Sequence, residues 1–194
     1  MVKRIDKRQE LIRVGSEIVI RQGFNAASLN DILSAAGVPK GSFYYYFSSK
    51  EDFGLAIVDD FAVKYEQKLE SMFADKKFSP LMRLRNYFKS GIADMERSDC
   101  NDGCLMGNLA QELSAQNELF RDRLKLVFTR WEQSFIDCLS AAKSAGELKG
   151  NFDLAELAKF ILSGWQGSIL QAKVTKSTSP MQNFVKMLFQ QILI

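Results

Sequence analysis

The 194-residue sequence contains no histidine, and this absence excludes much of the usual chemistry of enzymes and metal sites. Without histidine there is no imidazole to act as a general base, to activate a serine or cysteine nucleophile, or to supply the common nitrogen ligand of zinc. The sequence also lacks a glycine-rich phosphate-binding loop of the GxGxxG type. We therefore expect a protein that is not an enzyme, with no catalytic residues, no metal site and no cofactor.

Proline is scarce, with three in the chain, and long apolar runs are missing. Few prolines among many leucines, alanines, lysines and glutamates favour an all-α protein. Hydrophobic residues make up 46% of the chain, which is enough for a substantial core. No apolar run reaches the length of about 18 residues that a transmembrane helix needs, and the N-terminus is too charged for a signal peptide. We expect no membrane partner and a cytoplasmic location.

The net charge of +3 is unevenly distributed. Residues 1–50 carry eight Lys/Arg and four Asp/Glu, whereas the rest of the chain carries 18 and 19. A basic N-terminal segment suits a domain that faces the phosphates of a nucleic acid. The nearly neutral remainder of the chain, called the body below, would then have a different function. Four basic residues at the start of the first expected helix can reach a DNA backbone or simply be solvated: Lys3, Arg4, Lys7 and Arg8.

Residues 28–47 predict two short helices joined by a tight turn. Ser28 is suited to cap the first helix, with Asp31 three residues further on. Gly37 stands where a helix ends in the left-handed conformation, and Pro39 can begin the next helix but cannot continue the first. The spacing therefore predicts a helical hairpin of the helix-turn-helix kind.

The second of these helices, about residues 40–47, has two different faces. Phe43 and Phe47 lie four residues apart, so they share a buried face. The other face carries small, cationic and phenolic side chains, which suits the major groove of DNA.

The run AAGVPKGSFYYYFSSKE, residues 35–51, resembles the DNA-binding signature of the TetR/AcrR family of transcriptional regulators. The similarity extends over roughly residues 5 to 55. It implies phosphate contacts from Ser28, Tyr44 and Lys50. Lys40, Gly41, Ser42 and Tyr45 would lie in the major groove. The family often has histidine among the aromatic positions, whereas this chain has three consecutive tyrosines.

The resemblance also implies a domain organisation. A three-helix DNA-binding domain would occupy residues 1–48, and a helical ligand-binding and dimerisation domain residues 49–194, with about nine helices in all. The apolar periodicity predicts helices over about 5–22, 49–73, 80–97, 117–145, 153–174 and 179–194, with a shorter one beginning near residue 104. By resemblance, the last two helices form a homodimer that reads a palindromic operator. Gly164, Gly167 and Ser168 are small enough for close helix approach.

Three cysteines, Cys100, Cys104 and Cys138, suggest where the body senses its signal. Cys138 lies in an apolar stripe and is expected to be inert. Cys104 follows Asp102-Gly103 at a predicted helix N-terminus, where the helix dipole favours a thiolate.

Two short segments, 103–110 and 170–173, resemble a TetR subgroup that includes the N-ethylmaleimide-responsive repressors, which regulate reductases that detoxify electrophiles. The resemblance implies redox or electrophile sensing at Cys104, with Lys173 as a partner that stabilises the thiolate. The same Gly-Cys block occurs more widely in the family, so simple packing of Cys104 is the alternative.

Two other functions stay open from sequence alone. A repressor of this kind could respond to reversible binding of a hydrophobic or aromatic small molecule. The candidate pocket residues are Tyr65, Phe88, Met106, Asn108, Trp131, Phe135 and Trp165. In either case an effector near residue 104 is expected to tilt the long helix 49–73 and release the operator. The more distant alternative is a helical protein–protein adaptor, which predicts no salt-dependent DNA binding.

Overall fold

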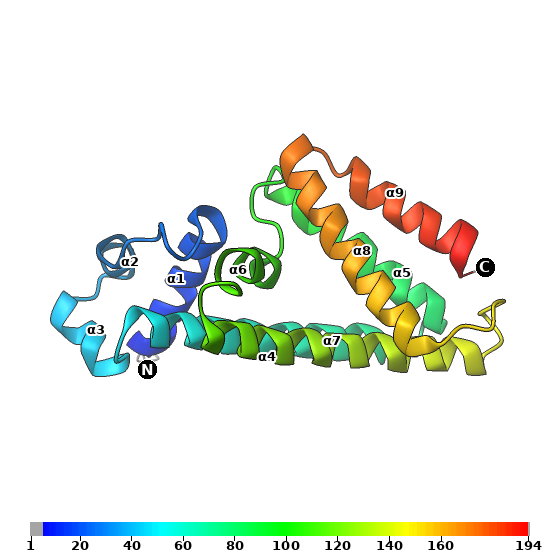
Figure 1. Cartoon of the computed structure of the whole chain (residues 1–194), viewed down its shortest axis with the longest axis horizontal. Coiled ribbons are helices and arrows are strands. Elements are labelled where there is room, and N and C mark those ends of the chain that lie inside the picture. Colours follow the sequence, from blue (N-terminus) through cyan, green and yellow to red (C-terminus); the bar gives the residue numbers. More distant parts are fainter. Residues whose placement is uncertain (1–5, 194) are drawn as a thin grey trace. The chain divides into compact units, whose positions relative to one another are not determined.

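In the computed structural model, which describes residues 6–193, every regular element is helical (Figure 1). This confirms the all-α expectation. The α-helices are α1 (Lys7–Gln22), α2 (Leu29–Ala36), α3 (Lys40–Tyr46), α4 (Lys50–Phe73), α5 (Pro80–Arg97), α6 (Leu105–Leu113), α7 (Glu118–Ser144), α8 (Leu154–Thr175) and α9 (Ser179–Met187).

The helix boundaries agree with the sequence-based ones to within a few residues except at the C-terminal end. There α9 stops at Met187 and continues as a π-helical turn, Leu188–Ile192. The predicted ends at Ile5 and Ile194, and the basic residues Lys3 and Arg4, lie outside the described residues. Among the helices described, none combines the length and the apolar character that crossing a bilayer requires.

The chain forms two compact units. The first comprises the chain up to Val63 together with Cys104–Lys125, and the second comprises Lys64–Gly103 together with the chain from Leu126 onward. By packing, α6 therefore belongs with the N-terminal helices, although it follows α5 in sequence. The functional boundary between residues 48 and 49 stays a prediction.

In the first unit, α1 packs closely against the start of α4. Asp6 begins α1 by accepting a hydrogen bond from the Arg8 backbone N–H at 3.0 Å. Gly15 faces α4 so closely that a Cβ there would lie 2.3 Å from the ring of Phe53. Any larger residue at position 15 would push the two helices apart, so glycine is required for this contact.

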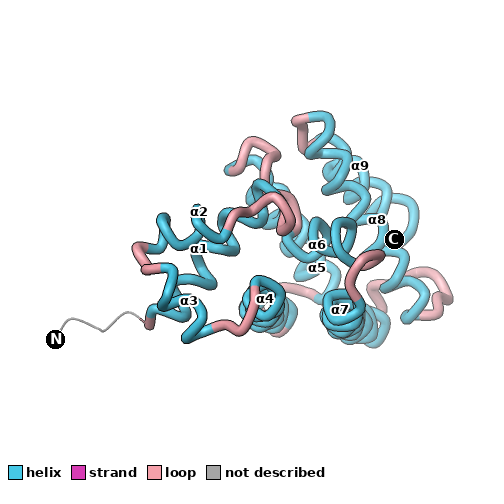
Figure 2. Tube along the Cα trace, turned by 60° about the vertical axis from the view of Figure 1, so that its left-hand side comes forward, coloured by secondary structure: helices cyan, strands magenta, loops and turns pink. Residues whose placement is uncertain are grey.

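The hairpin of the first unit forms as its sequence predicts (Figure 2). The Oγ of Ser28 accepts a hydrogen bond from the Asp31 backbone N–H at 3.2 Å and so caps α2. Gly37 ends α2 in the left-handed conformation, with φ of 60°. Pro39 has extended backbone and precedes α3 directly. These local features fix the turn between α2 and α3.

The second unit has an aromatic core between its helices. Gly91 of α5 approaches Trp165 of α8 so closely that a Cβ would lie 2.6 Å from the indole. Gly164 of α8 makes a similar approach to Phe184 of α9.

The carboxylate of Glu147 caps the N-terminus of α5. It accepts hydrogen bonds from the Ser79 hydroxyl and from the Leu81 backbone N–H.

Candidate DNA-binding face and effector-sensing residues

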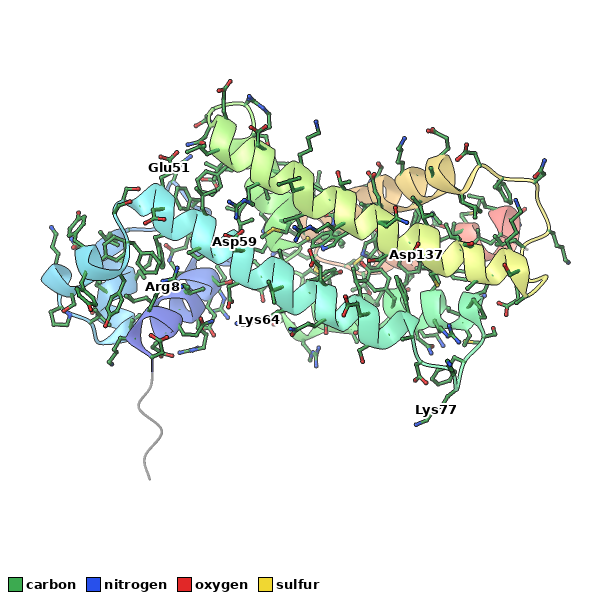
Figure 3. All side chains as sticks on the ribbon, turned by 90° about the horizontal axis from the view of Figure 1, so that it is seen from below. Arg8, Glu51, Asp59, Lys64, Lys77 and Asp137 are labelled. Atoms are coloured by element: carbon green, nitrogen blue, oxygen red, sulfur yellow. The ribbon has the colours of Figure 1, made fainter. Side chains whose placement is uncertain are left out.

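Helix α3 is held in place by two buried phenylalanines. Phe43 and Phe47 are 0% and 2% exposed, and their ring centroids lie 5.4 Å apart. Both rings also pack on Phe53 of α4, at 5.5 and 4.9 Å. The guanidinium of Arg8 covers the ring of Phe47 at 5.0 Å, and Figure 3 labels Arg8 on α1. These contacts fix which face of α3 points outward.

The outward face of α3 carries the residues that the resemblance assigns to the major groove, together with Tyr44, which it assigns to a phosphate contact. Lys40 and Gly41 are exposed and Ser42 is half-buried. Tyr44 and Tyr45 are 59% and 84% exposed, which is unusual for aromatic rings in a folded protein. The face offers an ammonium group, three hydroxyl groups and, at Gly41, a backbone with open space beside it. Such a surface can donate hydrogen bonds to base edges and phosphates.

Ser28 and Lys50 differ from the exposed residues of α3, because both already make hydrogen bonds inside the first unit. The Ser28 oxygen acts as the cap of α2, which leaves its O–H to donate elsewhere. The Lys50 ammonium donates to the Asn25 carbonyl at 3.2 Å and lies 4.9 Å from the ring centre of Phe24. One of its three protons is therefore used, and the phosphate contacts of both residues stay predictions.

A clamp between α6 and the N-terminal helices was not foreseen from sequence. The two carboxylate oxygens of Glu112 accept hydrogen bonds from the Phe24 and Asn25 backbone N–H groups at 2.8 and 2.7 Å. Asn108, one turn earlier on α6, donates from its side chain to the Ile20 carbonyl at 3.3 Å. The partners are 87 or 88 residues apart in sequence, so no local pattern indicates them. The clamp ties α6 to the end of α1 and the turn before α2.

Cys104 occupies the N-cap position of α6 and is half-buried. Lys173 of α8 donates a hydrogen bond to the carbonyl of Asp102, two residues before Cys104 in sequence, at 3.3 Å. Cys104 thus has its predicted position at a helix N-terminus, whereas its sensing role and the role of Lys173 as the partner of its thiolate stay predictions.

The other two thiols are buried. Cys138 is buried, and this burial raises the pKa of its thiol to about 12. Its Sγ–H donates to the Pro80 carbonyl at 3.4 Å. Cys100 is buried as well, at 4% exposure. None of the three cysteines takes part in a disulfide, and the residues described contain no group of three or more His, Cys, Asp or Glu that could hold a metal ion.

Five of the seven candidate pocket residues meet in the second unit. Tyr65 stacks on Trp131 with 4.5 Å between ring centroids, and Phe88 packs edge-on against Trp165 at 4.9 Å. Phe135 joins them through Tyr87, whose ring centre lies 5.3 Å away. Met106 and Asn108 instead belong to the first unit, where Met106 is fully buried.

The helices α8 and α9 expose apolar side chains on the surface of the second unit. Phe160 is 52% and Val174 78% exposed, and Gly167 lies midway between them at seven-residue spacing, with open space beside its Cα. These positions share one face of α8. Of the other two small residues named above, Gly164 packs against Phe184 and Ser168 is buried, with its hydroxyl bonded to the Trp165 carbonyl.

Two family models match the chain. Residues 11–57 match the family described as "Bacterial regulatory proteins, tetR family". Residues 80–188 match the family described as "Tetracyclin repressor-like, C-terminal domain". The first match contains all of α2 and α3, and the second contains every helix from α5 to α9.

Similar proteins are found along the whole chain. The HTH-type transcriptional repressor DhaR of Mycobacterium sp. (strain GP1) is 32% identical over 96% of this chain and 92% of its own. The transcriptional regulator AcuR of Cereibacter sphaeroides is 37% identical, covering 92% and 81%. The crystal structure of reduced Escherichia coli NemR superimposes with a TM-score of 0.91 at 26% identity, covering 97% of each chain. With an N-terminal helix-turn-helix, an exposed recognition helix and these relatives, the chain belongs to the TetR family of transcriptional regulators.

Proposed function

We propose that the protein is a transcriptional repressor that binds a palindromic operator as a homodimer and is released by an effector acting on its body. The observation that carries the proposal is the outward face of α3. Buried phenylalanines orient this helix, while Lys40, Tyr44 and Tyr45 remain exposed with donors available for DNA. The similarity to the repressors DhaR and NemR supports repression over activation. Binding to chromosomal DNA is the basis for the proposed cytoplasmic location.

Dimerisation is supported by the exposed face of α8. Phe160, Leu170 and Val174 would leave a large apolar surface in water in a monomer, and Gly167 between them allows a second helix to approach closely. A twofold-symmetric pair places two recognition helices on successive half-sites of the operator. We expect Val174→Glu to convert the dimer to a monomer in sedimentation analysis. Val63→Glu, at an exposed valine of the first unit, serves as the control.

The proposed response involves α6. Because Glu112 and Asn108 bind α6 to the end of α1 and the following turn, a displacement of α6 pulls directly on the DNA-binding helices. The effector could thus act on the DNA-binding helices through α6 as well as through the long helix α4. An effector releases DNA only to the extent that it binds the displaced arrangement better than the DNA-binding one.

Two kinds of effector have support. An electrophile or oxidant reacting at Cys104 is supported by its position at the N-terminus of α6 and by the similarity to NemR, whose structure is described as a reduced form. A reversibly bound aromatic molecule is supported by the ring cluster around Trp131 and Phe135. Both act through the body, and one protein could use both.

Operator binding before and after treatment with N-ethylmaleimide tests the proposal. The wild-type protein should bind DNA from upstream of its own gene with an affinity that falls steeply as salt increases. Binding that does not depend on salt, or no binding at all, would support the adaptor alternative instead. If the wild-type complex dissociates after treatment and the Cys104→Ser complex does not, Cys104 is the sensor. If both remain bound, the effector is a reversible ligand.

A further inference from the structure

A cavity of about 370 Å³ lies where three segments of the second unit meet. These segments are the start of α5, the loop after α7 and the π-helical turn after α9 (Figure 1). The wall consists of Ser79, Leu81, Met82, Arg85, Glu147 and Phe189. None of these residues belongs to the candidate sensor at Cys104 or to the ring cluster around Trp131, so the cavity is a separate site.

The wall contains one cation, Arg85 of α5. Its guanidinium lies 4.4 Å from the ring centre of Phe189, which is 3% exposed and therefore fixed in position. Within residues 6–193 this half-buried guanidinium makes no hydrogen bond and no ion pair. Stacking on a ring orients a guanidinium without using its N–H donors. Arg85 thus presents an oriented pair of donors of the kind that binds a carboxylate.

The wall also contains one carboxylate, Glu147 in the loop after α7. Its Oε2 accepts hydrogen bonds from the Ser79 hydroxyl at 3.1 Å and from the Leu81 backbone N–H at 2.8 Å. Its Oε1 accepts none from residues 6–193. Leu81 and Arg85 lie four residues apart on α5, which is about 6 Å along the helix axis. The carboxylate is therefore held about one helical turn from the origin of the Arg85 side chain, and the two charges do not pair with each other.

The rest of the wall is largely apolar. Leu81 is 8% exposed, whereas Met82 is 41% exposed and offers a flexible surface to a ligand. A simple anion would be attracted by Arg85 and repelled by Glu147, and a simple cation would meet the reverse. A small molecule that carries both charges and an apolar group matches every part of this wall.

We propose that the cavity binds a free amino acid with an apolar side chain, such as phenylalanine or leucine. The carboxylate of the amino acid accepts hydrogen bonds from the guanidinium of Arg85, and its ammonium group donates to Oε1 of Glu147. Its side chain packs on Leu81 and Met82. Binding is non-covalent, and the inference does not rest on the proposed function, since neither DNA nor a second subunit takes part in it.

The test compares L-phenylalanine with two analogues that each lack one charge. 3-Phenylpropionate lacks the ammonium group, and 2-phenylethylamine lacks the carboxylate. In titration calorimetry with the full-length protein at low salt, L-phenylalanine should bind about tenfold or more tightly than either analogue.

Two variants assign the preference to the two charges. Glu147→Gln keeps a carbonyl acceptor for the Ser79 and Leu81 donors, so α5 remains capped, and it should abolish the preference over 3-phenylpropionate. Arg85→Gln should abolish the preference over 2-phenylethylamine. Lys89→Gln removes an exposed charge one turn further along α5, outside the cavity wall, and should change neither preference.

Methionine signals locate the bound amino acid. With carbon-13 methyl labels on the seven methionines, the Met82 signal, identified by Met82→Leu, should shift when L-phenylalanine is added. Met187 is 48% exposed but does not line the cavity, so its signal should not move. The proposal is overturned if L-phenylalanine does not bind at millimolar concentration, if the analogues bind equally well, if Glu147→Gln keeps the preference, or if Met82 does not respond. None of these readouts involves DNA, so their failure is distinct from a failure of operator binding.

Discussion

Tyrosine occupies opposite environments in the two units of this protein. In the first unit, Tyr44 and Tyr45 are 59% and 84% exposed on α3. In the second, Tyr87 is 4% exposed and shares a hydrogen bond with Tyr65. The exposed pair contributes little to packing and remains available for a partner, whereas Tyr87 is part of the core and Tyr65 is half-buried beside it. Aromatic content alone therefore does not separate a binding surface from a hydrophobic core.

The same contrast occurs within α3 itself. Phe43 and Phe47 are buried against Phe53, while the neighbouring tyrosines point outward. A short helix with little surface to bury needs such an anchor, because seven residues do not form a stable helix alone. The exposed face of α3 is thus oriented by residues that are themselves buried.

The largest expected effect is on stability, when a core ring is removed from the second unit. Phe88→Ala deletes a fully buried ring that contacts Tyr87, Phe135 and Trp165, and should lower the free energy of unfolding by about 3–5 kcal/mol. Tyr45→Ala is the matched change at an exposed ring and should stay within about 0.5 kcal/mol of wild type. Denaturant unfolding measures both. If both variants lost the same free energy of unfolding, the buried ring of Phe88 and the exposed ring of Tyr45 would contribute equally to stability, contrary to the expectation.

The next effect is on DNA binding alone. Lys40→Ala should weaken operator binding by about 1–3 kcal/mol, because it removes a donor from the groove-facing side of α3, and should leave unfolding unchanged. Lys149→Ala removes the same charge from an exposed loop of the second unit and is the control. Fluorescence anisotropy at fixed salt compares them. If both variants bind equally well, α3 is not the recognition helix.

Local sequence rules predicted most of the DNA-binding unit. The cap at Ser28, the left-handed Gly37 and the buried Phe43 and Phe47 each depend on residues close together in sequence. Such features are local, so a single sequence specifies them.

What sequence reasoning missed is long-range. The bonds of Glu112 to the backbone at residues 24 and 25 join segments far apart in the chain, and a half-buried glutamate on a short helix looks like any other surface charge. The assignment of α6 to the first unit follows from the same contacts. The unpaired indole of Trp131 was also invisible, because it depends on what surrounds the ring rather than on the residue itself.

A third effect, on local stability, is expected at the clamp that Glu112 forms with the turn after α1. Glu112→Ala leaves the Phe24 and Asn25 N–H groups without their acceptor and should lower stability by about 1–3 kcal/mol. Glu112→Gln retains one carbonyl acceptor and should cost less. Gln111→Ala, at an exposed neighbour on α6, is the control. Hydrogen exchange at residues 24 and 25 locates the change, since faster exchange there in both Glu112 variants, but not in the control, is the expected pattern.

The smallest effect on the folded protein is expected at the thiols, where the contrast between exposed and buried groups recurs. Burial raises the pKa of Cys138 to about 12, so it stays protonated and unreactive near neutral pH, and Cys100 is equally inaccessible. Cys104 is half-buried at the start of α6 and should be the one residue labelled by N-ethylmaleimide. Mass spectrometry should therefore find one added group in wild type and in Cys138→Ser, and none in Cys104→Ser.

Raising the pH by about two units should leave Cys138 unlabelled, because its thiolate forms only near its raised pKa. A label on Cys138 in the folded protein would mean that the contact between α4 and α7 around Cys138 opens readily.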